Sequence, residues 1–228
     1  MTKIVAVIQA RMNSSRLPGK MMLDLKGAPV IEWVYRRVGG ARMVDDIIVA
    51  VPETPEDKIL KEFLEGLGAG VFTGSEKDVL GRFYGAARER GATHVIRVCA
   101  DNPFISPEEI DALVQFYLSH ACDYAYNHIP KGNRYADGLG AEMVAMEVLE
   151  RIHQRASLPE EREHIFNYVW NHADEFKMAT FDPANEKVAR PELRLDLDTQ
   201  DDYDRYRGLP VDIEMPSEKI IELIEGAA

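Results

Sequence analysis

The stretch KIVAVIQARMNSSRLPGK, residues 3–20, decides the fold prediction. Residues 3–10 are mostly apolar, with β-branched side chains and no alternation, which is typical of a strand buried on both faces of a parallel sheet. The remaining residues carry three cations, Arg11, Arg16 and Lys20, and no carboxylate. The sequence therefore predicts a buried first strand followed directly by a basic loop, in a chain whose formal net charge is −12.

Strand and helix patterns alternate after this stretch. Buried strands are expected at 47–51, 68–74 and 93–101, and helices at 30–38, 54–66 with Thr54 as N-cap, 78–90 and 106–120. This order predicts an α/β fold with a mostly parallel sheet and helices on both faces. Ligands bind such sheets beyond the carboxyl ends of the strands. The basic loop and the segment RVCADNPF, residues 97–104, should therefore meet at one rim.

The second half of the chain has a less regular pattern. Residues 123–144 are rich in Tyr, Asn, Gly and Asp, which indicates strands joined by a long loop. A helix is expected at about 157–172 and a strand at LRLDLDT, residues 193–199. Thr199 and Asp202 predict the cap of a further helix, and Pro216 precedes the last one. Because no repeat or linker is evident, we expect one domain, residues 1–228.

Composition excludes several classes of protein. With 46% hydrophobic and 29% charged residues, the 228-residue chain is typical of a globular protein. The acidic balance argues against nucleic-acid polymers and anionic membranes as partners. Cys99 and Cys122 form no C-x-x-C motif, which favours a reduced, cytoplasmic protein. The N-terminal apolar run is about six residues, far below the length that spans a bilayer.

The basic loop has the chemistry to bind a triphosphate. It lacks the Walker and dinucleotide glycine patterns. Backbone N–H groups after a strand, the guanidiniums of Arg11 and Arg16, and the Lys20 ammonium nevertheless suit phosphate oxygens. Asn13 and Ser14 add short hydrogen-bonding groups. A solvated basic loop is the alternative; it is the usual explanation of a single cation, but three at this spacing favour phosphate binding.

Three aspartates could hold a divalent cation. Asp101 ends the strand at 93–101, while Asp196 and Asp198 stand at i and i+2 and share one face of the expected late strand. Carboxylates with water and phosphate are the ligands that Mg²⁺ prefers. Alternatively, Asp101 caps a turn and the pair lies on the solvent face of an edge strand. Together with the basic loop, however, these carboxylates predict a phosphoryl- or nucleotidyl-transfer site.

Several blocks carry a resemblance to a known family. IQARMNSSRLPGK, GSEKDVLGRF, RVCADNPFI, YADGLGAEM, EREH and LDLDTQDDY resemble, in this order, the spore-coat polysaccharide synthesis protein F family of cytidylyltransferases. More distantly they are similar to the sialic-acid and 3-deoxy-manno-octulosonate cytidylyltransferases. The resemblance covers about residues 4–206. It implies a Rossmann-like nucleotide-diphospho-sugar transferase fold and Mg²⁺-dependent transfer of CMP from CTP to a sugar, with pyrophosphate leaving, in surface polysaccharide or glycan synthesis.

The resemblance also implies roles for individual residues. Those expected to bind the nucleotide are Ala10, Arg11, Asn13, Ser14, Arg16, Lys20, Ser75 and Asp78, with Arg11, Arg16 and Lys20 also catalytic. Mg²⁺ would be held by Asp101, Asp196 and Asp198. Related isoprenoid and molybdopterin enzymes have Gly-Gly in the first block; Ala10-Arg11 here favours an acidic sugar.

The acceptor site is the least determined part of the prediction. Its expected residues are Asn102, Asp137, Arg162 and His164, and either Arg162 or Arg134 could pair with a sugar carboxylate. The acids of EREH can equally be explained as first-turn residues that favour the helix dipole. The sialic-acid enzymes often have a glutamine for the acceptor sugar where this chain has Ala100-Asp101-Asn102, which leaves the acceptor open.

Three alternative functions stay open. The first is a nucleotidyltransferase that uses another NTP or a sugar 1-phosphate, the second is a non-catalytic module that binds CTP, and the third is an oxidoreductase. A Rossmann oxidoreductase shares the element order but lacks the glycine fingerprint. Relatives of this type are commonly dimers, so a homodimer is expected.

Overall fold

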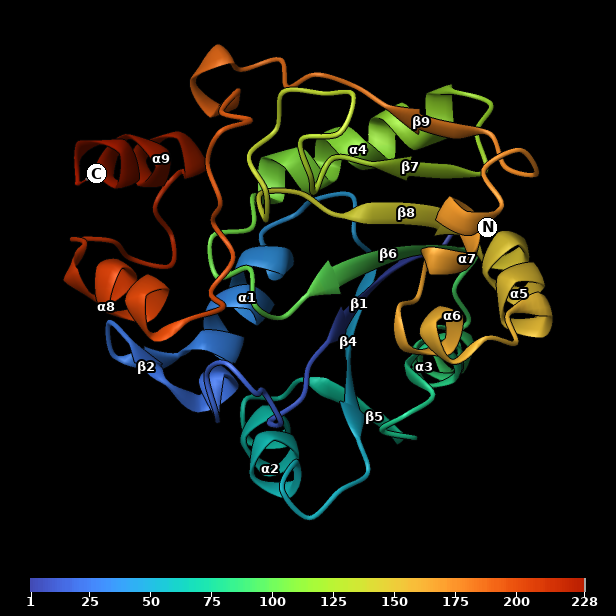
Figure 1. The fold of residues 1–228 in the computed structure, drawn as a ribbon, viewed down its shortest axis with the longest axis horizontal. Coiled ribbons are helices and arrows are strands. Elements are labelled where there is room, and N and C mark those ends of the chain that lie inside the picture. Colours follow the sequence, from blue (N-terminus) through green and yellow to red (C-terminus); the bar gives the residue numbers. More distant parts are fainter. Residues whose placement is uncertain (228) are drawn as a thin grey trace.

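The computed structural model describes residues 1–227, and a mixed sheet runs through its centre (Figure 1). In the described part this sheet has seven strands in the order β5-β4-β1-β6-β8-β7-β9. They are β1 Ile4–Gln9, β4 Asp46–Pro52, β5 Gly70–Gly74, β6 His94–Cys99, β7 Tyr124–Tyr126, β8 Glu142–Ala145 and β9 Met178–Thr180. β5, β4, β1 and β6 are parallel, β8 is antiparallel to both β6 and β7, and β9 is parallel to β7.

Helices cover both faces of the sheet. One core cluster packs with α1 Val30–Gly39, α2 Lys58–Gly66, α4 Pro107–Ser119, α8 Gln200–Gly208 and α9 Ser217–Gly226. The other packs with α3 Val79–Glu89, α5 Met146–Arg155, α6 Pro159–Glu163 and α7 Asn167–Asn171. Short elements complete the chain: η1 Lys20–Met22, the hairpin β2 Asp24–Leu25 and β3 Ala28–Pro29, and η2 Glu186–Val188.

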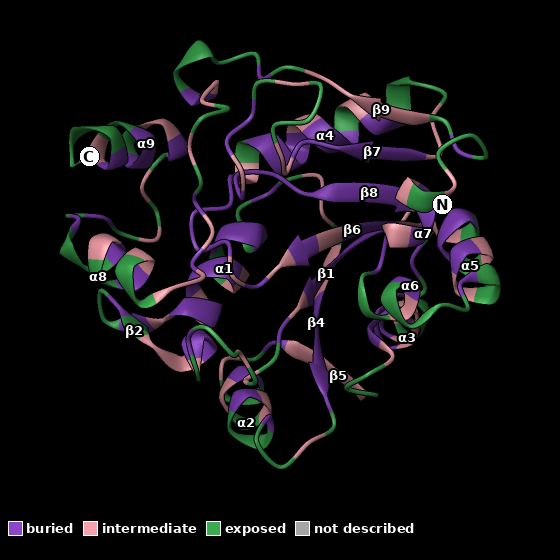
Figure 2. Cartoon of the chain, in the orientation of Figure 1, coloured by how far each residue is buried: buried purple, intermediate pink, exposed green. Residues whose placement is uncertain are grey.

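Burial on two faces explains the apolar sequence of the first strand. Alternate residues of β1 enter opposite clusters: Ile4 and Ile8 lie in one, Val5 and Val7 in the other. Figure 2 shows the central strands as buried and the outer helix faces as exposed. The predicted fold class and the element order of the first 120 residues are therefore confirmed. Within residues 1–227, every helix is too short or too polar to cross a membrane.

The start of α2 differs from the prediction. The helix begins at Lys58, one turn later than the expected cap at Thr54. The Thr54 hydroxyl donates to Asp57 Oδ2 at 2.5 Å, and Asp57 Oδ1 accepts from the Met12 N–H at 2.6 Å. Thr54 Oγ1 also accepts from the Asp57 N–H at 3.2 Å, so the predicted Thr54 cap forms but closes a separate turn at residues 54–57, ahead of α2.

The helix expected at 157–172 is also wrong as a single element. It breaks into α6 and α7 at His164, whose backbone is extended (φ −110°, ψ 102°). The break lets Ile165 and Phe166 both enter the core, which one continuous helix would present on different sides.

The strand expected at 193–199 is likewise not formed. The segment is extended but makes only an isolated bridge between Asp137 and Arg194. Its backbone instead bonds the loops at the rim, since the Leu197 N–H donates to the Asp101 carbonyl at 2.7 Å. The segment therefore crosses the carboxyl end of β6 rather than extending the sheet.

The predicted cap of α8 is confirmed and fixes the end of this segment. Thr199 Oγ1 accepts from the Asp202 N–H at 3.2 Å. Asp202 Oδ2 accepts from the backbone N–H groups of Asp198 at 3.1 Å and Thr199 at 2.8 Å. Burial alone would raise the pKa of Asp202, but these hydrogen bonds hold it below its ordinary value.

Replacing this capping carboxylate should cost stability in a pH-dependent way. We expect Asp202→Ala to lower the free energy of unfolding by about 1 kcal/mol at pH 7. Because the folded-state pKa is depressed, the ionised group stabilises above its unfolded pKa of about 4, and this is lost as pH falls through the folded value. Urea unfolding at pH 7 and pH 3 measures both effects, with exposed Asp201→Ala as control. An equal wild-type-to-variant gap at both pH values would contradict this expectation.

Candidate functional site

A cavity lies at the carboxyl ends of β1 and β6, where the sequence predicts ligand binding. It has a volume of about 220 Å³, and we call it the rim cavity. Its lining residues are Gln9, Ala10, Arg11, Asn13, Ser14, Ser15, Arg16, Lys20, Met21, Arg97, Cys99, Ala100, Asp101 and Asp198. The fold thus brings the predicted basic loop together with two of the three predicted metal-binding aspartates.

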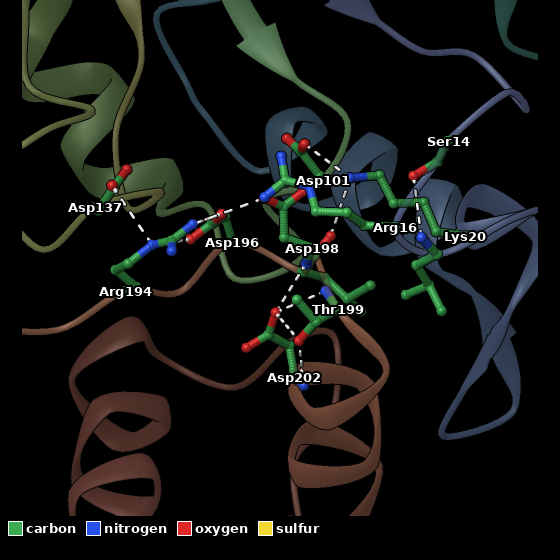
Figure 3. A network of polar contacts seen from close by, with 12 residues as sticks. Ser14, Arg16, Lys20, Asp101, Asp137, Arg194, Asp196, Asp198, Thr199 and Asp202 are labelled. Carbon is green, nitrogen blue, oxygen red and sulfur yellow. Dashed lines mark hydrogen bonds and ion pairs between the residues drawn. The ribbon is translucent and has the colours of Figure 1, made fainter.

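Lys20 lies at the centre of this site (Figure 3). Gly19, with φ of 70°, turns the chain into η1, and the Lys20 side chain is only 10% exposed. Its Nζ donates to Asp101 Oδ2 at 3.0 Å, to Asp198 Oδ1 at 3.2 Å and to the Leu197 carbonyl at 3.1 Å. One buried ammonium therefore joins the basic loop, the end of β6 and the crossing segment.

The two arginines of the basic loop lie closer to solvent. Arg16 Nη1 is 2.5 Å from Asp198 Oδ2, with the Arg16 side chain 65% exposed. Arg11 is exposed and has no ion-pair partner among residues 1–227. Exposed ion pairs contribute little to stability, whereas guanidinium–phosphate contacts are strong and often bidentate. Both guanidiniums are therefore available to an incoming polyanion.

The three predicted metal-binding aspartates do not form one cluster. Asp101 and Asp198 share Lys20, but Asp196 faces Arg194, with Oδ1 3.1 Å from Nε and Oδ2 2.5 Å from Nη2. No group of three His, Cys, Asp or Glu side chains in the described chain is placed to hold a metal ion. Two carboxylates supplemented by phosphate and water nevertheless suit Mg²⁺. Asp101 and Asp198 both contact Lys20 Nζ in this structure, and they are the two carboxylates of the rim cavity that could supply oxygen ligands to a metal.

A second cavity adjoins the first. We call it the side cavity; it has a volume of about 690 Å³. Its lining residues are Arg11, Ser75, Glu76, Lys77, Asp78, Ser157, Pro159, Arg162 and Glu163. Because Arg11 lines both cavities, a ligand that spans them would pass this guanidinium.

The side cavity holds predicted residues of two different roles. Arg162, expected at the acceptor, donates through Nε to Asp78 Oδ1 at 2.8 Å and through Nη2 to Asp78 Oδ2 at 2.5 Å. Burial alone would raise the pKa of Asp78, but bonds from Arg162 and the Gly81 N–H hold it below its ordinary value. His164 is exposed. The structure therefore places Arg162 beside the predicted nucleotide residues Ser75 and Asp78.

The other two predicted acceptor residues, Asn102 and Asp137, lie outside the side cavity that holds Arg162. Asn102 is buried beside Gly138, which has φ of 85°. Asp137 is 4.0 Å from Arg194 across the crossing segment. Burial, together with the neighbouring Asp196 carboxylate, raises the pKa of Asp137 above its ordinary value. Asn102 and Asp137 are thus grouped with the aspartates, and Arg162 is not.

Gly138 holds these loops in close approach, which allows a direct test. A Cβ at this position would lie 3.0 Å from the Asp196 backbone nitrogen and 3.1 Å from Asn102 Oδ1. We expect Gly138→Ala to destabilise the protein by about 1–3 kcal/mol. Gly68→Ala is the matched control, because Gly68 has φ of 81° but open space around its Cβ position. Thermal unfolding should show the larger loss for Gly138→Ala; equal losses would mean that crowding contributes nothing.

Sequence reasoning missed three polar residues that line the rim cavity from β1 and β6, and we call them its floor: Gln9, Arg97 and Cys99. A signal was present, because Arg97 is the only charge in the apolar part of THVIRVCAD, residues 93–101. Burial raises the pKa of Cys99 to about 12, so its thiol stays protonated at neutral pH. The floor therefore contributes one cation and two neutral polar groups.

Comparison with known proteins shows which family this sequence matches. A family model described as cytidylyltransferase matches residues 5–222. The chain is 31% identical to the spore coat polysaccharide biosynthesis protein SpsF of Bacillus subtilis, over 92% of the chain and 87% of the relative. It is 35% identical to the 3-deoxy-manno-octulosonate cytidylyltransferase of Geobacter sulfurreducens, over about half of each protein (49% and 44%).

A solved structure extends the likeness to the whole fold. The structure of a cytidylyltransferase from Leptospira borgpetersenii superposes with a TM-score of 0.89 at 28% identity, covering 99% of this chain and 95% of that one. The resemblance seen in the sequence blocks is therefore confirmed over nearly the full length. Fold, family model and full-length relatives agree that this chain belongs to the cytidylyltransferase family.

Proposed function

We propose that this protein is a Mg²⁺-dependent cytidylyltransferase that transfers CMP from CTP to an acidic sugar, releasing pyrophosphate, in surface polysaccharide or glycan synthesis. Family membership supports nucleotidyl transfer. The observation that carries the proposal is the placement of Lys20 Nζ between Asp101 and Asp198, in a cavity that Arg11 and Arg16 also line. That arrangement provides cations for phosphates beside carboxylates for a metal.

The cations account for the triphosphate. Lys20 would act as a buried point charge, and the guanidiniums of Arg16 and Arg11 would bind phosphate oxygens at the mouth. Arg16 would exchange its contact with Asp198 for phosphate. Asn13 and Ser14 line the same cavity, and their side chains and the loop N–H groups would add hydrogen bonds.

The reaction would be an in-line displacement at the α-phosphorus. An acceptor hydroxyl oxygen forms the new bond to phosphorus and loses its proton, while the bond to pyrophosphate breaks. Negative charge grows on the α-phosphoryl and pyrophosphate oxygens, and preorganised cations stabilise it. Mg²⁺ held by Asp101 and Asp198 would supply further positive charge to these oxygens.

The two cavities suggest how the substrates divide the site. The cytidine would extend past Arg11 into the side cavity, toward Ser75 and Asp78. The sugar would lie on the side of Asn102 and Asp137. An acidic sugar is favoured because the Geobacter sulfurreducens relative is named for 3-deoxy-manno-octulosonate, which bears a carboxylate.

A pyrophosphate-release assay tests this function. Purified protein would be given each of the four NTPs with Mg²⁺ and, as acceptor, 3-deoxy-manno-octulosonate, N-acetylneuraminate or a sugar 1-phosphate. We expect pyrophosphate from CTP with an acidic sugar, and loss of turnover when EDTA removes the metal. Turnover with another NTP or with a sugar 1-phosphate would replace the proposed substrates. CTP binding without pyrophosphate release would indicate a non-catalytic module.

A further inference from the structure

Arg97 is a charged residue on the floor of the rim cavity that the proposed mechanism leaves unused. It lies on the central strand β6, two residues before Cys99, and its side chain is 18% exposed. It shares the cavity with Arg11, Lys20 and Asp101. Burying a guanidinium in the middle of a sheet is costly unless it is paired with an opposite charge and hydrogen-bonded.

One edge of the Arg97 guanidinium is fixed by a buried carboxylate. Nη1 donates to Glu142 Oε2 across the antiparallel pair of β6 and β8. Glu142 is itself held, since the Tyr124 hydroxyl donates to its Oε1 at 2.5 Å and His128 Nε2 lies 3.7 Å from it. Burial alone would raise the pKa of Glu142, but Arg97, His128 and Tyr124 hold it below its ordinary value. The carboxylate is therefore ionised and sets the orientation of Arg97.

The Nε edge of the guanidinium has no hydrogen-bond partner in the described part of the protein. Arg97 Nε is buried, and Gln9 Oε1 is likewise buried without a hydrogen-bond partner among residues 1–227. Both residues line the rim cavity. An unsatisfied buried donor costs about 1–3 kcal/mol, so its presence on a cavity floor indicates a ligand group that completes it.

The arginines expected from the sequence to bind a sugar carboxylate are occupied elsewhere. Arg134 pairs with Asp182 at 3.1 Å and Glu186 at 2.7 Å, outside the rim cavity. Arg162 is held by Asp78 in the side cavity. Arg11 and Arg16 belong to the basic loop, which is expected to bind the triphosphate. Arg194, which lies beside Asp137, is paired with Asp196. Among the guanidiniums that line the rim cavity, Arg97 is therefore the one outside the basic loop.

We infer that Arg97 binds the carboxylate of the acceptor sugar through its Nε edge, and that Glu142 is the positioning residue that aims it. This inference rests on the proposed function. Since Glu142 offsets the charge of Arg97, recognition depends on directed, charge-assisted hydrogen bonds rather than on net positive charge. Neutral sugars would leave the Nε donor unpaired, which disfavours them.

Binding measurements on the enzyme saturated with Mg²⁺ and a non-hydrolysable α,β-methylene analogue of CTP test this assignment. 3-Deoxy-manno-octulosonate and N-acetylneuraminate would each be titrated beside their methyl esters. We expect at least one acid to bind wild type roughly 10- to 100-fold more tightly than its ester, the size of a hydrogen bond to a charged group. Arg97→Gln combined with Glu142→Gln removes both charges together, so that no buried charge is left unpaired. This variant should lose the preference and keep its affinity for the CTP analogue.

Two further variants separate recognition from structure. Arg134→Gln, the matched control outside the cavity, should keep the full preference for the acid. Glu142→Gln alone leaves the Arg97 charge but frees its orientation, so the KM for the acid should rise with little change in kcat.

Three outcomes would overturn the assignment of Arg97. They are an acid preference that survives in the double variant, a loss of CTP-analogue affinity instead of acid affinity, and wild type that binds neither acid better than its ester. Failure of the proposed function is distinguishable, because it would appear as wild-type protein that releases no pyrophosphate from CTP.

Discussion

Lys20→Ala is expected to lower kcat/KM for CTP by roughly 10²–10³, the loss typical of removing one preorganised donor from a polar site. Lys20 Nζ is a buried cation in the rim cavity, with three oxygen partners between 3.0 and 3.2 Å away. Without it, phosphate oxygens would meet the carboxylates of Asp101 and Asp198 with no charge between them. Steady-state pyrophosphate release at varied CTP measures the effect, and folding is checked by circular dichroism and thermal unfolding.

A matched lysine separates this effect from a general loss of charge. Lys58 pairs only with Glu62 on the surface of α2, 3.6 Å apart and exposed. Lys58→Ala removes the same charge from the protein and should leave turnover near the wild-type value. If folded Lys20→Ala protein released pyrophosphate as fast as wild type, the rim cavity would not be the triphosphate site.

Asp198→Ala should cause a loss of similar size for a different reason. Asp198 is 14% exposed and contacts both Arg16 and Lys20, so its removal disturbs two cations and one expected metal ligand. We expect kcat to fall by roughly 10²–10³. In the milder Asp198→Asn variant, which keeps the shape but not the charge, the Mg²⁺ concentration for half-maximal rate should rise. A titration of Mg²⁺ at saturating CTP measures this shift.

Asp201→Ala is the control for this second prediction. Asp201 is exposed in the first turn of α8, three residues after Asp198. Its loss should change neither the rate nor the Mg²⁺ requirement. An unchanged Mg²⁺ requirement in Asp198→Asn would remove Asp198 from the set of metal ligands while leaving its part in holding Lys20 intact.

The first half of the fold could be predicted because its signals are local. Continuous apolar runs mark strands that are covered on both faces, and the helices expected from 78 and 106 form with Asp78 and Ser106 as the caps of α3 and α4. The later start of α2 was not predicted: Thr54 caps a separate turn, and the Asp57 carboxylate in that turn also accepts from the Met12 N–H 45 residues away. The local cap and the tertiary hydrogen bond use different oxygens of Asp57, and only the fold shows that both form.

The residues of the site likewise divide into those that the sequence predicted and those that it did not. The basic loop was recognisable, because its cations and its turn lie within ten residues and follow a buried strand. The role of the late aspartates depended on a strand that does not form. Asp198 reaches Lys20 since the crossing segment bonds the Asp101 backbone, and Asp196 turns to Arg194 instead. Two of the three aspartates therefore meet through backbone contacts that side-chain periodicity does not encode.

The sequence by itself determined the order of strands and helices, the burial of β1 on both faces and the charge of the loop that follows it. Residue type and short-range periodicity are sufficient for these properties. Only the tertiary structure decided which carboxylates face Lys20, up to 178 residues away, that Arg162 belongs with Asp78, and that Arg97 lies on the cavity floor. The physical reason is that such contacts depend on how distant backbone segments pair, and many pairings satisfy the same local pattern.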